Sequence, residues 1–238
     1  MSRPPWFWPR IAAWMDGAVP TESMPAERMT RITAIVPYRE NPAGKSRLAP
    51  LLTHDARRRL AQAMLADVLA VLEGARGIES ILLVGDAPGG SSGGSKLSVL
   101  VSDAALNSAL ELAAARAFEA GAEAVCIVHA DAPLLGAAEL DEFLSAAAGS
   151  DAVHIAPCER DEGTTLLCVP RAAGIAFAYG ADSFQRHRAA YAARGVAVEV
   201  HGRVPDVDLP ADLTALREAL QRSPELAPHT RAALCRRT

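Results

Sequence analysis

Asp131 is the acidic residue whose setting in the chain most clearly suggests chemistry. It follows an apolar run, 125–128, that predicts a buried strand, and Pro133 prevents that strand from continuing. The Asp131 carboxylate must therefore turn into whatever cleft lies at the strand end. A hard oxygen ligand at such a place suits a Mg²⁺ ion that holds a polyphosphate. An aspartate that only caps the next turn is the alternative interpretation.

A second acidic group lies near the carboxyl end of the chain, where Asp206 and Asp208 flank Val207. In an extended segment, alternate side chains share a face, so the two carboxylates should point the same way and Val207 the opposite way. Either aspartate could then supply the second metal ligand. Asp212 follows closely, and we assign it to the first turn of a helix, where the helix dipole favours a negative charge.

Basic and hydroxyl side chains follow other predicted strands. Lys45 and Arg47 surround a flexible glycine segment after the first strand, which suits a clamp on polyphosphate oxygens, although a solvated basic loop would look the same. The spacing is not that of a P-loop. Gly and hydroxyl residues at Thr164, Gly180 and Ser183 predict an anion site built partly from backbone N–H groups. Ser183 could also be a plain helix N-cap, and the two roles are compatible.

The elements that must position these residues alternate along the chain. Short β-rich runs at 32–36, 80–84, 97–101, 125–128, 152–156, 166–169 and 196–200 are separated by helical patterns at 55–72, 105–120, 138–147, 183–194 and from 210 or 211 to about 220. This order predicts an α/β fold with a doubly wound, mostly parallel sheet flanked by helices, in a single domain spanning 31–238. Ligands of such sheets bind outside the carboxyl ends of the strands, where the residues above stand.

Composition narrows the function classes. The net charge of -4 and the aromatic content of 5% argue against nucleic-acid binding. No apolar run approaches the ~20 residues of a membrane span, and residues 1–30 have the composition of a disordered extension rather than a secretory signal. The four cysteines are widely spaced, which argues against disulfides or a zinc site and favours a reducing, cytoplasmic location.

Seven segments, taken in order, resemble the 2-phospho-L-lactate guanylyltransferase family, known as CofC or FbiD, which acts in coenzyme F420 biosynthesis. The matching segments are GKSRLAP at 44–50, MLADVL at 64–69, LNSAL at 106–110, ADAPLL at 130–135, GTTLL at 163–167, YGADSFQRH at 179–187 and VDLPADL at 207–213. Each segment is weak alone, but seven in the right order are specific. The resemblance implies the MobA-like fold of nucleotide-diphospho-sugar transferases.

The same resemblance implies a reaction and a role for each residue. GMP would pass from GTP to the phosphate of a small phosphorylated carboxylic acid, with release of pyrophosphate; the acid would be 2-phospho-L-lactate, phosphoenolpyruvate or 3-phospho-D-glycerate. The resemblance implies that Asp131 and Asp208 bind Mg²⁺, with Asp206 as a further ligand, and that Lys45 and Arg47 bind the GTP phosphates. It also implies that Asn107 lies near the nucleoside, and that the acceptor is bound by Thr164, Gly180 and Ser183.

Two other functions remain open at this stage. A molybdopterin or sugar-phosphate nucleotidyltransferase would carry a glycine-rich L-x-G-G-x-S/G-x-R-M-G start, which the segment 37–48 lacks. A non-catalytic nucleotide-binding protein would bind GTP without releasing pyrophosphate. For the assembly, we expect a homodimer, since two-fold pairs are the commonest oligomers.

Overall fold

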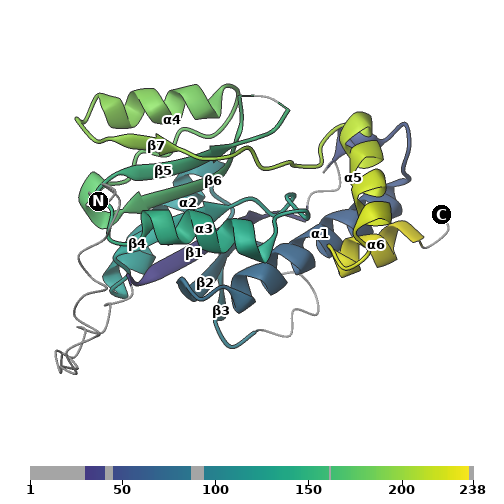
Figure 1. The fold of residues 1–238 in the computed structure, drawn as a ribbon, viewed down its shortest axis with the longest axis horizontal. Helices are drawn as coiled ribbons and strands as arrows, with labels where there is room; N and C mark the ends of the chain where they lie inside the picture. The colour runs from purple at the N-terminus through teal and green to yellow at the C-terminus, as the bar shows by residue number, and fades with distance from the viewer. Residues whose placement is uncertain (1–29, 41–44, 87–93, 161, 236–238) are drawn as a thin grey trace, which may run out of the picture.

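The described part of the chain forms a seven-stranded mixed sheet with helices on both faces (Figure 1). The computed structural model describes residues 30–40, 45–86, 94–160 and 162–235, so the predicted extension over 1–30 lies almost wholly outside them. The strand order is β3-β2-β1-β4-β6-β5-β7. The strands are β1 (Ile32–Tyr38), β2 (Ile78–Gly85), β3 (Leu97–Val101), β4 (Ala124–Val128), β5 (Val153–Pro157), β6 (Thr164–Pro170) and β7 (Val198–Val200).

One strand runs against the others and so shapes the ligand edge. The pairs β1–β2, β1–β4, β2–β3 and β5–β7 are parallel, whereas β6 is antiparallel to both β4 and β5. The mostly parallel sheet predicted from the sequence is therefore confirmed, with β6 as the exception. Because Val128 pairs with Leu166, the beginning of β6 lies at the same edge as the end of β4. This reversal brings Thr164 close to the segment that carries Asp131.

The first strand is longer than the predicted run 32–36 and includes a proline. Pro37 lies inside β1, which continues to Tyr38. Pairing with β4 stops at Ile35, while pairing with β2 continues, so one side of Pro37 has no neighbouring strand that would require its missing N–H. Opposite Tyr38, Gly85 has φ 122°, and a Cβ there would lie 2.1 Å from the Tyr38 carbonyl oxygen. Only glycine allows this close approach of the two backbones.

Helices cover the sheet in two layers. The apolar faces of α1 (His54–Gly74) and α3 (Ala137–Ala147) form one core with the sheet, and those of α2 (Leu106–Glu119) and α4 (Ser183–Ala192) form the other. Thr53 caps α1, its side chain accepting a hydrogen bond from the Ala56 N–H. None of the helices in the described ranges combines the length and apolar composition that a membrane crossing requires.

A third core joins the carboxyl-terminal helices to α1, at the right of Figure 1. It is formed by α5 (Pro210–Arg222), by α6 (Pro228–Cys235), by residues of α1, and by Leu48, the last residue of the short 3-10 helix η2 (Ser46–Leu48). The sequence patterns did not predict α6. The helix has eight residues, of which only Thr230 is buried, so it lacks a recognisable apolar stripe.

Asp67 of α1 anchors this unpredicted helix. Its side chain is 3% exposed, and its two carboxylate oxygens accept hydrogen bonds from the backbone N–H groups of His229 and Thr230, at 3.0 and 2.7 Å. The carboxylate therefore caps the amino end of α6 from another helix, which satisfies free N–H groups and complements the helix dipole. The MLADVL segment thus carries a structural aspartate.

We expect Asp67→Ala to lower the free energy of unfolding by about 2–3 kcal/mol, because two charge-assisted hydrogen bonds are lost and the buried N–H of Thr230 is left without its partner. Urea denaturation followed by circular dichroism would measure this. Asp55→Ala, in the exposed first turn of the same helix, is the matched control and should change the midpoint little. Equal stability of the Asp67→Ala protein and the natural protein would contradict the capping role.

Candidate active site

A cleft of about 550 Å³ opens at the sheet edge where β4 ends and β6 begins. Its volume lies in the usual range for small-molecule sites. The cleft brings together most of the residues predicted from the sequence. Those that line it are Arg47, Asp131, Thr164, Gly180, Ser183, Asp206 and Asp208.

Lys45 lies between two of the cleft carboxylates. Its Nζ is 2.5 Å from Asp131 Oδ2 and 3.6 Å from Asp208 Oδ1, and Arg47 Nη1 is 2.7 Å from Asp208 Oδ2. The Lys45 backbone is in the left-handed region, with φ 53°, a conformation that costs about 1–2 kcal/mol for a residue with a side chain. The ion pairs favour this conformation, because it brings the ammonium to Asp131 and Asp208, although Lys45 itself is not among the residues that line the cleft.

The charges of the cleft shift one another's pKa values. Burial alone would raise the pKa of Asp131, but the Lys45 ammonium and His129 hold it below its ordinary value. Burial alone would lower the pKa of Lys45, but Asp131 raises it above its ordinary value, with smaller help from Asp208 and Asp206. Asp131 is therefore ionised and Lys45 protonated over the whole physiological range.

Asp206 and Asp208 reach the cleft from an extended segment that precedes α5. The Val207 N–H donates to the Asp131 carbonyl at 2.9 Å, which ties this segment to the end of β4. Val207 is buried in the third core while both aspartates line the cleft, so the predicted alternation is confirmed. Asp212 accepts hydrogen bonds from the N–H groups of Asp208 and Leu209, at 2.9 and 2.6 Å. Asp212 lies in the first turn of α5, as expected, and its carboxylate also caps that helix.

Asp206 is the carboxylate with the least compensated charge. Burial raises its pKa, and repulsion from Asp131 raises it further, although Cys158 and Arg160 oppose this. Three carboxylates on one cleft wall create a negative potential that a cation would relieve, and their oxygens are the ligand type of a hard divalent ion. The donor set at this edge therefore fits a divalent metal, and Lys45 neutralises part of the same negative charge.

Outside the cleft, another group of side chains could hold a metal ion. Among the described residues, the possible ligand atoms of this group all lie within 4.8 Å of one another; its members are His154, Glu199 and His201. None of these three lines the cleft. His154 Nδ1 and His201 Nε2 are 2.9 Å apart and share a hydrogen bond. That bond accounts for their proximity, so we do not assign this group to the active site.

Asn107 is positioned differently from the other predicted residues. It lies in the first turn of α2, and its side-chain amide is bonded on both sides to the Tyr179 backbone: Nδ2 donates to the carbonyl at 3.1 Å and Oδ1 accepts from the N–H at 2.8 Å. Asn107 is absent from the cleft lining, whereas its neighbour Leu106 is present. The amide thus fixes the segment that holds Gly180, and a contact with a nucleoside stays a prediction.

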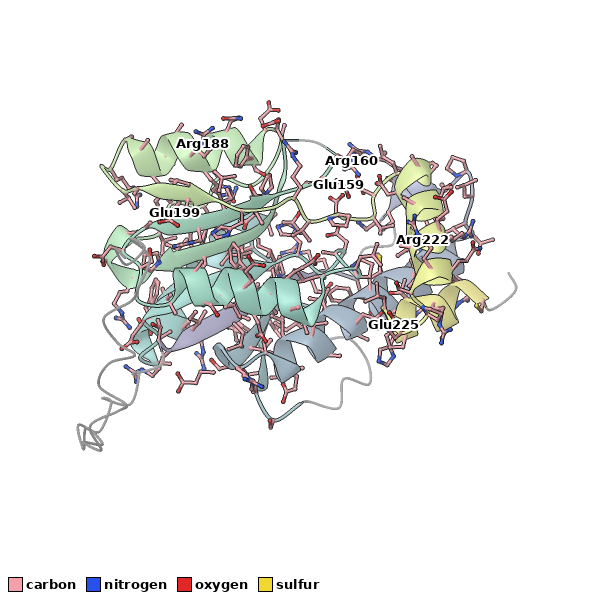
Figure 2. All side chains as sticks on the ribbon, viewed as in Figure 1. Glu159, Arg160, Arg188, Glu199, Arg222 and Glu225 are labelled. Carbon is pink, nitrogen blue, oxygen red and sulfur yellow. The ribbon has the colours of Figure 1, made fainter. Side chains whose placement is uncertain are left out.

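Arg160 was not singled out from the sequence. Its Nη1 is 3.1 Å from Asp206 Oδ1 and also contacts Asp212 Oδ2, and the side chain lines the cleft. Figure 2 shows Arg160 beside Glu159, between the strand layer and α5. The rule that strand ends carry function would have found it, because the charged segment 159–162 follows β5 directly.

Comparison with known proteins identifies the family of this chain. A family model described as "Guanylyl transferase CofC like" matches residues 32–216. This chain belongs to the CofC-like guanylyl transferase family. It is therefore a nucleotidyltransferase, as the resemblance of the seven segments implied. The matched range contains every residue of the cleft named above.

Two curated relatives of the CofC-like chain are named phosphoenolpyruvate guanylyltransferase. The protein of Conexibacter woesei is 37% identical over 212 residues, which cover 84% of this chain and 94% of the relative. The protein of Sphaerobacter thermophilus is 36% identical over 194 residues, covering 79% and 93%. These matches are long enough to support the family across nearly the whole length of both relatives.

Solved structures support the fold. A protein described as a nucleotide-diphospho-sugar transferase, from Desulfovibrio desulfuricans, superposes with a TM-score of 0.70 at 19% identity and covers 87% of this chain and 94% of its own. A Mycobacterium tuberculosis protein solved as a complex with manganese has a TM-score of 0.51 at 19% identity, covering 80% and 100%. The nucleotide-diphospho-sugar-transferase-like fold predicted from the sequence is therefore confirmed.

We expect Lys45→Met to destabilise the protein most at neutral pH. Asp131 has a depressed pKa in the folded state, so its stabilising interaction is fully present above the unfolded-state pKa, near 3.8, and is lost as the pH falls through the folded value. The stability difference between the natural protein and Lys45→Met should therefore shrink below about pH 4. Urea denaturation at pH 7 and pH 3 tests this, and a difference that grew on acidification would refute the ion pair.

Proposed function

We propose that this protein transfers GMP from GTP to the phosphate of a small phosphorylated carboxylic acid and releases pyrophosphate. The observation that carries the proposal is the meeting, in one cleft, of carboxylates, cations and an anion-binding hydroxyl group on the chain of a CofC-like guanylyl transferase. Phosphoenolpyruvate is the acceptor favoured by the names of both curated relatives. 2-Phospho-L-lactate and 3-phospho-D-glycerate share its pairing of phosphate with carboxylate, and the product of any of the three would serve coenzyme F420 biosynthesis.

The proposed reaction is an in-line displacement at the α-phosphorus of GTP. An oxygen of the acceptor phosphate forms the new bond to phosphorus, and the bond to the oxygen that bridges the α and β phosphates breaks as pyrophosphate leaves. A phosphate monoester has a second pKa of about 6, so the attacking oxygen is already ionised at neutral pH. The reaction therefore needs no general base. It needs alignment of the reactants and relief of the repulsion between anions.

The charged side chains of the cleft would supply that relief. Lys45 and Arg47 form ion pairs with Asp131 and Asp208. On GTP binding, the two cations would instead contact the phosphates. Asp131 and Asp208, with Asp206 beside them, would hold a divalent cation, Mg²⁺ being the ion we expect. When bound, such a cation neutralises phosphate charge and orients the triphosphate.

On this proposal, Asp131→Asn should reduce pyrophosphate release from GTP plus phosphoenolpyruvate by about 100-fold or more, because the cleft loses a cation ligand without losing volume. A coupled pyrophosphate assay at saturating Mg²⁺ measures this. Glu218→Gln, on the exposed face of α5, is the control and should retain full activity. Near-normal turnover by Asp131→Asn would remove Asp131 from the metal site.

The acceptor can be identified with the natural protein. Incubation with GTP, MgCl₂ and each of the three acids in turn, followed by mass spectrometry, should give the GMP adduct of one acid in large excess over the others. Addition of EDTA should abolish product formation, and Mn²⁺ should restore it at least in part. GTP binding without any adduct would favour the alternative of a non-catalytic nucleotide-binding protein.

A further inference from the structure

Three buried polar side chains form a connected group beneath the proposed acceptor end of the cleft. Thr164 opens β6, while Ser183 and His187 lie on the first turns of α4. The Ser183 hydroxyl donates to Thr164 Oγ1 at 3.2 Å, and His187 Nδ1 is 3.1 Å from the same oxygen. Thr164 is 5% exposed, Ser183 2% and His187 0%. Thr164 and Ser183 line the cleft, whereas His187 lies behind them.

The tautomer of His187 follows from its second hydrogen bond. The backbone N–H of Ala178 donates to His187 Nε2 at 2.9 Å. A backbone N–H can only donate, so Nε2 must present its lone pair. Burial, and then the charges of His129 and Arg186, lower the pKa of His187 to about 4, so the ring is neutral at physiological pH. Its one proton is therefore on Nδ1, which donates to Thr164 Oγ1.

This arrangement leaves Thr164 a single role toward a ligand. A hydroxyl oxygen has two lone pairs and one proton. In Thr164 both lone pairs are taken, one by the Nδ1–H of His187 and one by the hydroxyl of Ser183. The Thr164 hydroxyl can then act only as a donor, and the side of the residue that lines the cleft is where a partner could accept that proton.

We infer that His187 is a positioning residue that fixes the Thr164 hydroxyl as a hydrogen-bond donor to an anionic oxygen, phosphate or carboxylate, of the acceptor substrate. This inference rests on the proposed function. It makes the acceptor pocket selective for oxygens that accept hydrogen bonds, because a ligand group that itself donates a proton finds no free lone pair on Thr164. Burial of all three side chains strengthens the preference, since an unpaired donor there is costly.

A purely structural role would look similar at first sight. The His187 ring packs edge-on against Tyr179, with ring centroids 4.6 Å apart, so its loss could simply loosen α4. Two amide substitutions separate the roles by atom position. The amide nitrogen of asparagine is bonded to Cγ, as Nδ1 of histidine is, and the amide group of glutamine reaches one atom further, as Nε2 does. Asparagine can keep the bond to Thr164, whereas glutamine can keep only the bond from Ala178.

We expect His187→Gln to raise the KM for phosphoenolpyruvate about tenfold, the effect of one hydrogen bond, while the KM for GTP stays unchanged. His187→Asn should leave both KM values near those of the natural protein, although it loses the bond from Ala178. In a Thr164→Val background, His187→Gln should add no further effect, because His187 acts only through Thr164. Arg188→Gln, exposed on α4 and labelled in Figure 2, is the surface control. Equal effects of the Asn and Gln variants, or a parallel rise in the KM for GTP, would overturn the inference.

A measurement without turnover separates this inference from the proposed reaction. In ¹⁵N NMR spectra of the natural protein, with the His187 ring assigned by its loss in His187→Asn, we expect the neutral tautomer that carries its proton on Nδ1. A proton on Nε2 would overturn the inference whatever the enzyme catalyses. If the Nδ1–H tautomer is found but no acceptor yields a GMP adduct, the proposed function fails while the orientation of Thr164 stands.

Discussion

The position of the Lys45 ammonium between Asp131 and Asp208 is the interaction on which the rest of the cleft depends. Three carboxylates could not share one wall without a nearby cation, because their mutual repulsion would protonate one of them or push the strand ends apart. Burial, and after it repulsion from Asp131, raise the pKa of Asp206, and the nearby cations Arg160 and Lys45 oppose this rise only in part. The cleft is thus a set of opposite charges held in near balance. On the proposed function, these charges would exchange partners when a polyphosphate and a metal ion bind.

The direction of β6 adds the second half of the cleft. If β6 ran parallel to β4, Thr164 would begin the strand at the opposite edge, away from the charged residues. Running antiparallel, it brings Thr164 and the amino end of α4 to the carboxylates. The charged residues therefore follow the carboxyl ends of strands, as Asp131 follows β4. The hydroxyl group of Thr164 instead lies at the amino end of a strand, β6.

The difference between residues at the carboxyl ends of strands and a residue at an amino end explains which parts of the cleft could be predicted from the sequence. Asp131 and Lys45 were found because the rule of strand ends needs only periodicity and chain direction. Thr164 was found for its residue type, but the direction of β6 was not, since alternation looks the same in parallel and antiparallel strands. The anchoring of α6 by Asp67 spans more than 160 residues of chain, and the tautomer of His187 depends on a backbone N–H of another segment. Local patterns contain no trace of such contacts.

The third core has a consequence for how the cleft is maintained. Leu48, next to the basic segment, and Val207, inside the acidic one, are buried in the same core as α5 and α6. The two oppositely charged segments thus pack on one apolar core, to which the carboxyl-terminal helices α5 and α6 also contribute. The positions of the opposite charges in the cleft therefore depend on apolar packing in the third core. Weakening α5 or α6 would loosen both segments at once, although neither helix has a residue among those that line the cleft.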